Sequence, residues 1–146
     1  MLKEGQVRIP SGCAIAAIID RKGGKINGSE IIKSIALMHD RSNGLGGGFA
    51  AYGIYPDHAD DYAFHVFYES QHAKSECEDY LFKHFNVDVS EKIPTKKIDS
   101  IANGPDIWRY FAKPNKVRMK ESRMDEEEYT VQCVMKVNQN IEGAFI

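Results

Sequence analysis

A short, uninterrupted apolar run, CAIAAII at residues 13–19, constrains the fold of this chain more than any other feature. It is continuous rather than alternating, which is typical of a strand buried on both faces. Even with Ser11 and Gly12 included, it is far shorter than the roughly 20 residues that span a bilayer. The charged residues Asp20 and Arg21 follow where a signal peptide needs small residues, so the run predicts a core strand and no targeting segment.

The composition is typical of a globular protein. The chain has 146 residues, a net charge of −2 and 42% hydrophobic residues, so it is neither polar nor charged enough to be disordered. A single compact domain over residues 13–146 is expected, preceded by a polar lead segment or propeptide over residues 1–12. Because the charges nearly balance, the chain lacks a long-range attraction for nucleic acid or anionic lipid, and we expect neither partner.

The cysteine pattern indicates a reducing compartment. Cys13, Cys77 and Cys133 are odd in number, widely spaced and without a CxxC pair. This argues against a secreted disulfide framework and against a four-thiolate zinc site. We therefore expect a cytoplasmic protein with no metal ion and no cofactor.

Apolar periodicity and turn residues predict an α+β fold. We expect strands over residues 13–19, 49–55, 62–69, 87–93 and 117–120, and helices over 29–41, 73–84, 106–111 and from 125 to about 142. Residues 144–146 resemble the beginning of a further buried strand, and from this we expect the first piece of a larger protein.

Two motifs allow a binding interpretation that the spacing does not favour. The glycines of residues 44–48 follow a predicted helix and precede a predicted strand, the reverse of a dinucleotide-binding loop, so a tight loop is the better interpretation. His72, Cys77 and His84 suggest metal ligands, but His72 is displaced from the helix face that the other two share. Packing is the better interpretation for these residues.

Cys13 admits two interpretations. As a small residue at the start of a core strand, it is simply buried, since free cysteines are among the most buried residue types. If the chain is cut between Gly12 and Cys13, the same residue gains a free α-amine with a pKa of about 7.7–8.0 beside its thiol. A nucleophile would then carry its own general base. Gly12, which has no side chain, would ease the cut.

The segments PSGCAIAAII (residues 10–19) and MHDRSNGLGGGFAAYGIYP (residues 38–56) together resemble the start of the class II glutamine amidotransferase domain, most closely its archaeal-type glutamate synthase branch. A weaker similarity covers residues 125–146. The resemblance implies the N-terminal part of an Ntn-hydrolase fold, an αββα sandwich. It also implies L-glutamine as substrate, with ammonia passed to a synthase domain or subunit.

The resemblance assigns roles to two residues and leaves others unfilled. Cys13 matches the nucleophile, and Arg41 matches the arginine of an Arg-Gly loop that packs beside the nucleophile and helps to fix its amine. Ser42 replaces the glycine of that loop, and Ala14 replaces the glycine that usually follows the nucleophile. The family's substrate-carboxylate arginine and oxyanion-hole Asn-Gly pair have no match. We therefore expect the isolated chain to be deficient in turnover.

The alternative is a non-catalytic α+β module that binds a ligand or another subunit, with Cys13 simply buried. The strand–helix–strand pattern over residues 62–120 would permit a ferredoxin-like fold, either alone or inserted in the larger domain.

Overall fold

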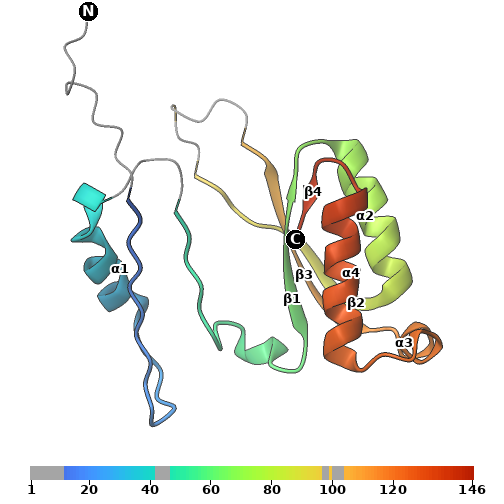
Figure 1. Ribbon diagram of the computed structural model, residues 1–146, viewed down its shortest axis with the longest axis horizontal. Coiled ribbons are helices and arrows are strands. Elements are labelled where there is room, and N and C mark those ends of the chain that lie inside the picture. The colour runs from blue at the N-terminus through green and yellow to red at the C-terminus, as the bar shows by residue number, and fades with distance from the viewer. Residues whose placement is uncertain (1–11, 42–46, 97–98, 100–103) are drawn as a thin grey trace, which may run out of the picture. The chain divides into compact units, whose positions relative to one another are not determined.

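The computed structural model describes residues 12–41, 47–96, 99 and 104–146. The predicted lead segment, apart from Gly12, lies outside the described residues, as does Ser42. The chain divides into two compact units, one ending at Tyr52 and the other comprising Gly53–Ile146 (Figure 1). The two units are described separately below.

Among its described residues, the first unit contains one α-helix, α1 (Gly28–Ala36), followed by a 3₁₀ turn over His39–Arg41. The residue before the helix, Asn27, caps it, because its side-chain oxygen accepts a hydrogen bond from the Ser29 amide at 2.9 Å. An oxygen in this position satisfies one of the amides that the first helical turn leaves unpaired. The predicted helix over residues 29–41 is thus confirmed over most of its length, although the cap is Asn27 rather than Ser29.

The predicted core strand over residues 13–19 is wrong. These residues adopt no regular secondary structure, and Ile15 and Ile19 are 92% and 83% exposed. A strand needs a hydrogen-bonded neighbour and covering layers on its faces. The described part of the first unit supplies neither, because it contains no strand and its helix buries no residue. The predicted strand over residues 49–55 is also wrong, because these residues form bends and loops.

The second unit is a small α+β fold with a four-stranded antiparallel sheet (Figure 1). Its strand order is β2-β3-β1-β4, which places β3 and β1 at the centre. Strands and helices follow one another in the β-α-β-β-α-β pattern of ferredoxin-like connectivity, with two helices in the second crossover. The elements are β1 (Tyr62–Tyr68), α2 (Gln71–His84), β2 (Phe85–Lys92), β3 (Asp106–Pro114), α3 (Lys116–Ser122), α4 (Glu126–Asn140) and β4 (Ala144–Phe145).

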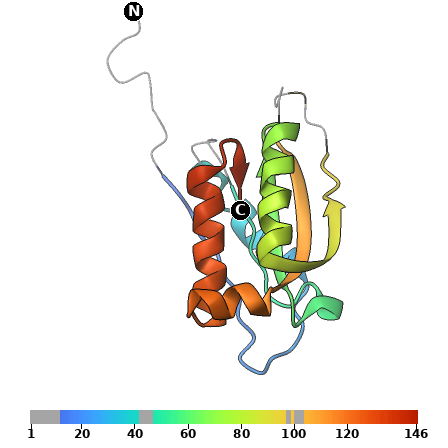
Figure 2. The same ribbon diagram turned by 90° about the vertical axis from the view of Figure 1, so that its right-hand side faces the viewer.

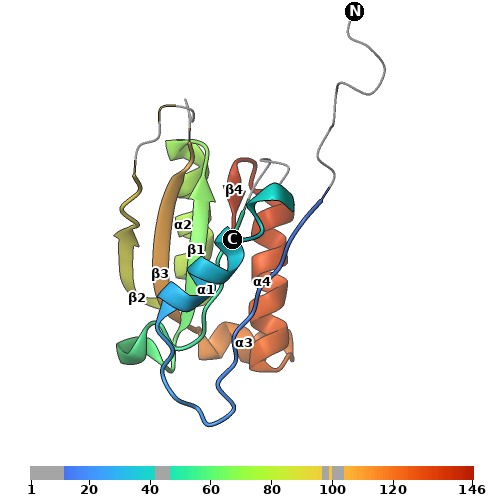
Figure 3. The ribbon, with the colours of Figure 1, turned by 90° about the vertical axis from the view of Figure 1, so that its left-hand side faces the viewer.

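The helices α2 and α4 lie side by side over one face of the sheet (Figure 2). Strand β1 alternates accordingly, with Phe64, Val66 and Tyr68 buried beneath the helices. Leu81 of α2 and Val137 of α4 complete this core with at most 1% exposure. Figure 3 shows β1 and β3 adjacent at the middle of the sheet, with β2 at its edge. None of the helices in the described residues is long and apolar enough to cross a membrane.

Two predicted elements between residues 106 and 122 are wrong in type. Residues 106–111, predicted as a helix, belong to β3, and residues 117–120, predicted as a strand, belong to α3. Both Tyr110 and Phe111 are buried although they point to opposite faces, so the strand shows no alternating pattern. Helix α3 is fixed locally, because the side-chain oxygen of Asn115 accepts from the Val117 and Arg118 amides.

A core substitution tests this layer arrangement. Leu81→Ala removes a side chain that is 1% exposed, and we expect it to lower the free energy of unfolding by about 2–5 kcal/mol. Val131→Ala, at a residue of α4 that is 62% exposed, is the matched control and should change the free energy of unfolding by less than about 0.5 kcal/mol. Urea unfolding followed by the fluorescence of Trp108, the single tryptophan, measures both. Equal effects of the two variants would contradict the arrangement.

Candidate functional site

The first unit brings the residue before Cys13 against the backbone of Arg41. A β-carbon placed on Gly12 would lie 2.9 Å from the Arg41 carbonyl oxygen, closer than real β-carbons approach. Arg41 ends the 3₁₀ turn, in which its amide donates to the Met38 carbonyl at 2.9 Å. Only glycine fits at position 12 without a shift, because the contact is with backbone rather than with a flexible side chain.

Cys13 itself is exposed. The interpretation of Cys13 as a buried core residue is therefore wrong, and the thiol is open to a reagent or substrate. The resemblance assigns roles to Cys13 and Arg41. Both residues lie in described parts of the first unit. Asn103 and the glycines of residues 44–46 lie outside the described residues, so the structure says nothing of their placement.

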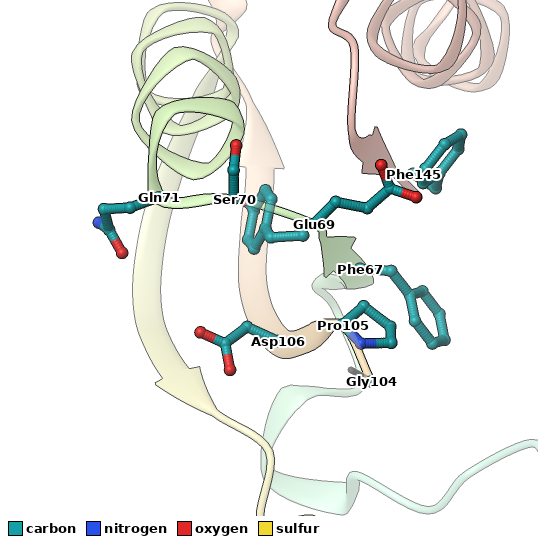
Figure 4. A pocket seen from close by; sticks show the side chains of 9 residues that line it. Phe67, Glu69, Ser70, Gln71, Gly104, Pro105, Asp106 and Phe145 are labelled. Atoms are coloured by element: carbon teal, nitrogen blue, oxygen red, sulfur yellow. The ribbon is translucent and has the colours of Figure 1, made fainter. Parts of the chain in front are cut away.

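An open groove in the second unit contains neither Cys13 nor Arg41 (Figure 4). It lies where β1 leads into α2 and where β3 begins. Phe67 and Phe145 form its aromatic side, while Glu69 and Asp106 contribute carboxylates. Asp106 is already paired with Lys92 at 2.6 Å. The groove therefore offers a shallow surface rather than a set of converging catalytic groups.

A buried polar network joins α2 to the sheet. Lys74 Nζ lies 2.7 Å from Glu78 Oε2 and 3.9 Å from the centroid of the Trp108 ring. The Tyr110 hydroxyl donates to Glu78 Oε1, and the Tyr68 hydroxyl donates to Tyr110, each at 3.0 Å. Burial raises the pKa of both phenols. The groups satisfy one another, so the network fixes the position of α2 rather than presenting reactive groups.

The residues that suggested a metal site lie in three different environments. Cys77 is fully buried in the core, and burial raises the pKa of its thiol. His84 Nδ1 lies 2.8 Å from the Tyr129 hydroxyl, and burial lowers the pKa of the imidazole. His72 is exposed. The described residues contain no group of three or more candidate metal ligands, and packing accounts for Cys77 and His84.

A second cluster of ionisable groups lies on the sheet face opposite α2 and α4. The Tyr55 hydroxyl lies 2.8 Å from His65 Nε2 and accepts from Arg109 Nη1 at 3.1 Å. Arg109 also donates through Nε to Glu91 Oε1 at 2.9 Å. Sequence reasoning missed this cluster because its members come from three strands and a preceding loop. Only the registration of the strands, His65 opposite Arg109 and Arg109 opposite Glu91, brings them together.

Comparison with known proteins gives one match in sequence. An uncharacterized protein of Archaeoglobus fulgidus is 39% identical over 136 residues, which cover 92% of this chain. The chain spans only 36% of the length of that protein. No family model matches the sequence, and no solved structure matches it. The matched length exceeds either unit, so the similarity extends over both.

The contact between Gly12 and Arg41 can be tested by adding one methyl group. Gly12→Ala should displace the 3₁₀ turn and shift the amide resonances of Met38, His39 and Arg41, because overpacking against backbone forces movement. Gly48→Ala is the control, since a β-carbon there meets nothing within 4 Å. Unchanged resonances in the Gly12 variant would show that the two backbones do not approach each other.

Proposed function

We propose that this chain carries the nucleophile of a class II glutamine amidotransferase of glutamate synthase type, within an Ntn-hydrolase domain. The observation that carries the proposal is the juxtaposition in the first unit. Gly12 lies against the Arg41 carbonyl, and the exposed Cys13 follows it directly. Two residues that the sequence resemblance pairs, 28 positions apart in the chain, are thereby neighbours through residue 12.

Cleavage of the Gly12–Cys13 peptide bond would create the base that the reaction needs. The new α-amine, with an ordinary pKa of about 7.7–8.0, takes the proton from the Cys13 thiol. The Arg41 carbonyl lies against Gly12, the residue before this amine, and we expect it to accept a hydrogen bond from the amine once the bond is cut. An uncleaved amide nitrogen has no basic lone pair and cannot take part in this way.

The reaction would then proceed in two balanced steps. The thiolate attacks the side-chain amide carbon of L-glutamine, the carbon–nitrogen bond breaks, and the protonated amine of Cys13 returns its proton to the leaving ammonia. This forms a γ-glutamyl thioester. Water then attacks the thioester while the amine takes one of its protons, the carbon–sulfur bond breaks, and glutamate leaves as the thiol is restored. Ammonia would pass to a synthase domain or subunit.

The proposal requires groups beyond those matched here. The arginine for the substrate carboxylate and the donors for the oxyanion have no counterpart within the 146 residues. Loss of a single oxyanion donor costs about 10²–10³ in rate. Because the chain spans 36% of its Archaeoglobus fulgidus relative, the remaining length of a protein of that kind has room for such groups.

The second unit favours a different function for residues 53–146. It is a sheet with its own helical layer and core, and it contains neither Cys13 nor Arg41. A non-catalytic module that binds a ligand or another subunit is the second candidate, and it is compatible with the first because the two functions would lie in different units.

A covalent probe tests the proposed nucleophile. An electrophilic glutamine analogue should label Cys13 once, and glutamate should compete with it poorly compared with glutamine. Cys13→Ala should abolish labelling and lower glutaminase activity by at least about 10³-fold, as loss of a covalent nucleophile does. Cys133→Ala, at a buried thiol, is the control and should keep both. Undiminished activity in the Cys13 variant of the product of the whole coding sequence would contradict the proposal.

A further inference from the structure

Strand β1 is fully paired along one of its two sides only. On one side all of its residues pair with β3. On the other side β4 pairs with Phe67 and Tyr68 alone. Within the residues that the structure describes, no strand pairs with residues 62–66 on that side, and we call this side of residues 62–66 the open edge. An edge of this kind can pair with a further strand.

The open edge presents backbone groups that a further strand would satisfy. The Glu69 amide donates to the Gly143 carbonyl at 2.9 Å, which fixes the side of the strand line that faces β4. The backbone groups of an antiparallel strand alternate between its two sides, so those of Ala63 and His65 face the same side as those of Glu69. Each of these two residues contributes one N–H donor and one C=O acceptor to the open edge.

The opposite edge of the sheet is protected against pairing, whereas the open edge is not. Strand β2 carries a register shift between Val87 and Val89, and Asp88, Glu91 and Lys92 place charges on it. Bulges and charges are common means by which an edge strand resists a further strand. Residues 62–66, with the sequence YAFHV, pair with β3 without a register shift and include no Asp, Glu, Lys or Arg. They have the composition of an interior strand.

Ile146 already follows the course that a strand along the open edge would take. Phe145 lies opposite Phe67, so Ile146 comes opposite Val66. Its amide donates to Asn138 Oδ1 at 2.8 Å, and Asn138 Nδ2 donates to its carbonyl oxygen at 3.2 Å. The side chain of Asn138 thus binds both backbone groups of Ile146, as a neighbouring strand would, and directs the backbone along β1.

Helix α4 presents apolar side chains beside the same path. The Ala144 amide donates to the Ile141 carbonyl, and Ile146 contacts Asn138, so β4 runs back along α4 toward the start of the helix. One and two turns before Asn138, on the same side of the helix, lie the two valines Val134 and Val131. Val134 packs against the core, and Val131 is 62% exposed. A strand along the open edge would pass beside both valines.

From these observations we propose that the open edge is a strand acceptor. Its occupant is the stretch that continues β4 in the product of the whole coding sequence, antiparallel to β1 as far as Tyr62. The Archaeoglobus fulgidus relative is longer than this chain, which spans 36% of it, so a protein of that kind carries further chain. The proposal does not rest on the proposed glutamine chemistry, because every group that it uses lies in the second unit.

The register of β4 sets the residue pattern of the added strand. With Ile146 opposite Val66, the next four residues come opposite residues 62–65 in reverse order. Strand β1 turns Phe64 toward the helices, and side chains directly opposite each other lie on the same face of a sheet. The second and fourth residues after Ile146 therefore face the helices, and we expect both to be apolar.

A second copy of this chain fits the open edge poorly. Two β1 strands paired antiparallel about Phe64 would place Val66 of each copy opposite Tyr62 of the other. Ile146 already lies opposite Val66 and is held there by Asn138. A strand that continues β4 meets no such obstacle, since it begins where Ile146 ends.

Amide hydrogen exchange at single-residue resolution tests the proposal by comparing the 146-residue chain with the product of the whole coding sequence. The Ala63 and His65 amides should exchange at least about tenfold more slowly in the whole product, because they become hydrogen-bonded there. The Phe64 and Val66 amides, which face β3, are the internal control and should be protected in both proteins. Equal exchange rates at His65 in the two proteins would overturn the proposal.

Ala63→Pro gives an independent test, because proline removes one N–H donor of the open edge and is tolerated in a strand only where that donor is unpaired. In the whole product, this variant should restore the fast exchange of the His65 amide. Ser90→Pro is the matched control, since alternation from the Ile93 amide, which donates to the Ile107 carbonyl of β3, places the Ser90 amide on the outer side of β2. It should leave His65 protected.

The same variants in the 146-residue chain show whether the sheet still folds. The Val66 amide should stay protected in the Ala63→Pro variant, because the bond from Val66 to β3 is untouched. Loss of that protection would mean that the Ala63 amide is needed within the sheet rather than at the open edge. That result, or a His65 amide that stays protected in the Ala63→Pro variant of the whole product, would also overturn the proposal.

Discussion

The burial of β3 on both of its faces is the constraint on which the second unit depends. On one face Tyr110 is buried beneath α2, and its hydroxyl donates to Glu78. On the other face Phe111 is buried beneath the rings of Tyr55 and His58. The same strand pairs with β1 on one side and with β2 on the other. Burying two large aromatic side chains in opposite directions is strongly favourable and leaves the sheet one register.

This double burial also explains what the sequence could and could not predict. Elements with a clear period, such as α2 and α4, were predicted correctly because one face of each is apolar and the other polar. Strand β3 has no such contrast, so residues 106–111 were predicted as a helix. Helix α3, where a strand was predicted over residues 117–120, depends on one local contact, the Asn115 side chain at its first turn.

The candidate sites differ in how far sequence could find them. Cys13 was singled out by its place after Gly12 and by the resemblance, and Arg41 by the resemblance alone. The close approach of Gly12 to Arg41 is a backbone contact that residue types do not encode. His65 of β1 and Arg109 of β3 lie far apart in the chain and meet only through strand register. Conversely, residues 13–19 were predicted to be buried because of their apolar character, yet burial requires covering elements that the described first unit lacks.

The account of function depends on a free amino group beside the Cys13 sulfur. The most direct measurement is the intact mass of the mature, glutamine-consuming protein made from the whole coding sequence. The account predicts a species that lacks residues 1–12 and begins at Cys13. A mature protein that retains those residues and still hydrolyses glutamine at a normal rate would contradict it, because the nitrogen of Cys13 would then be an amide with no proton-accepting role.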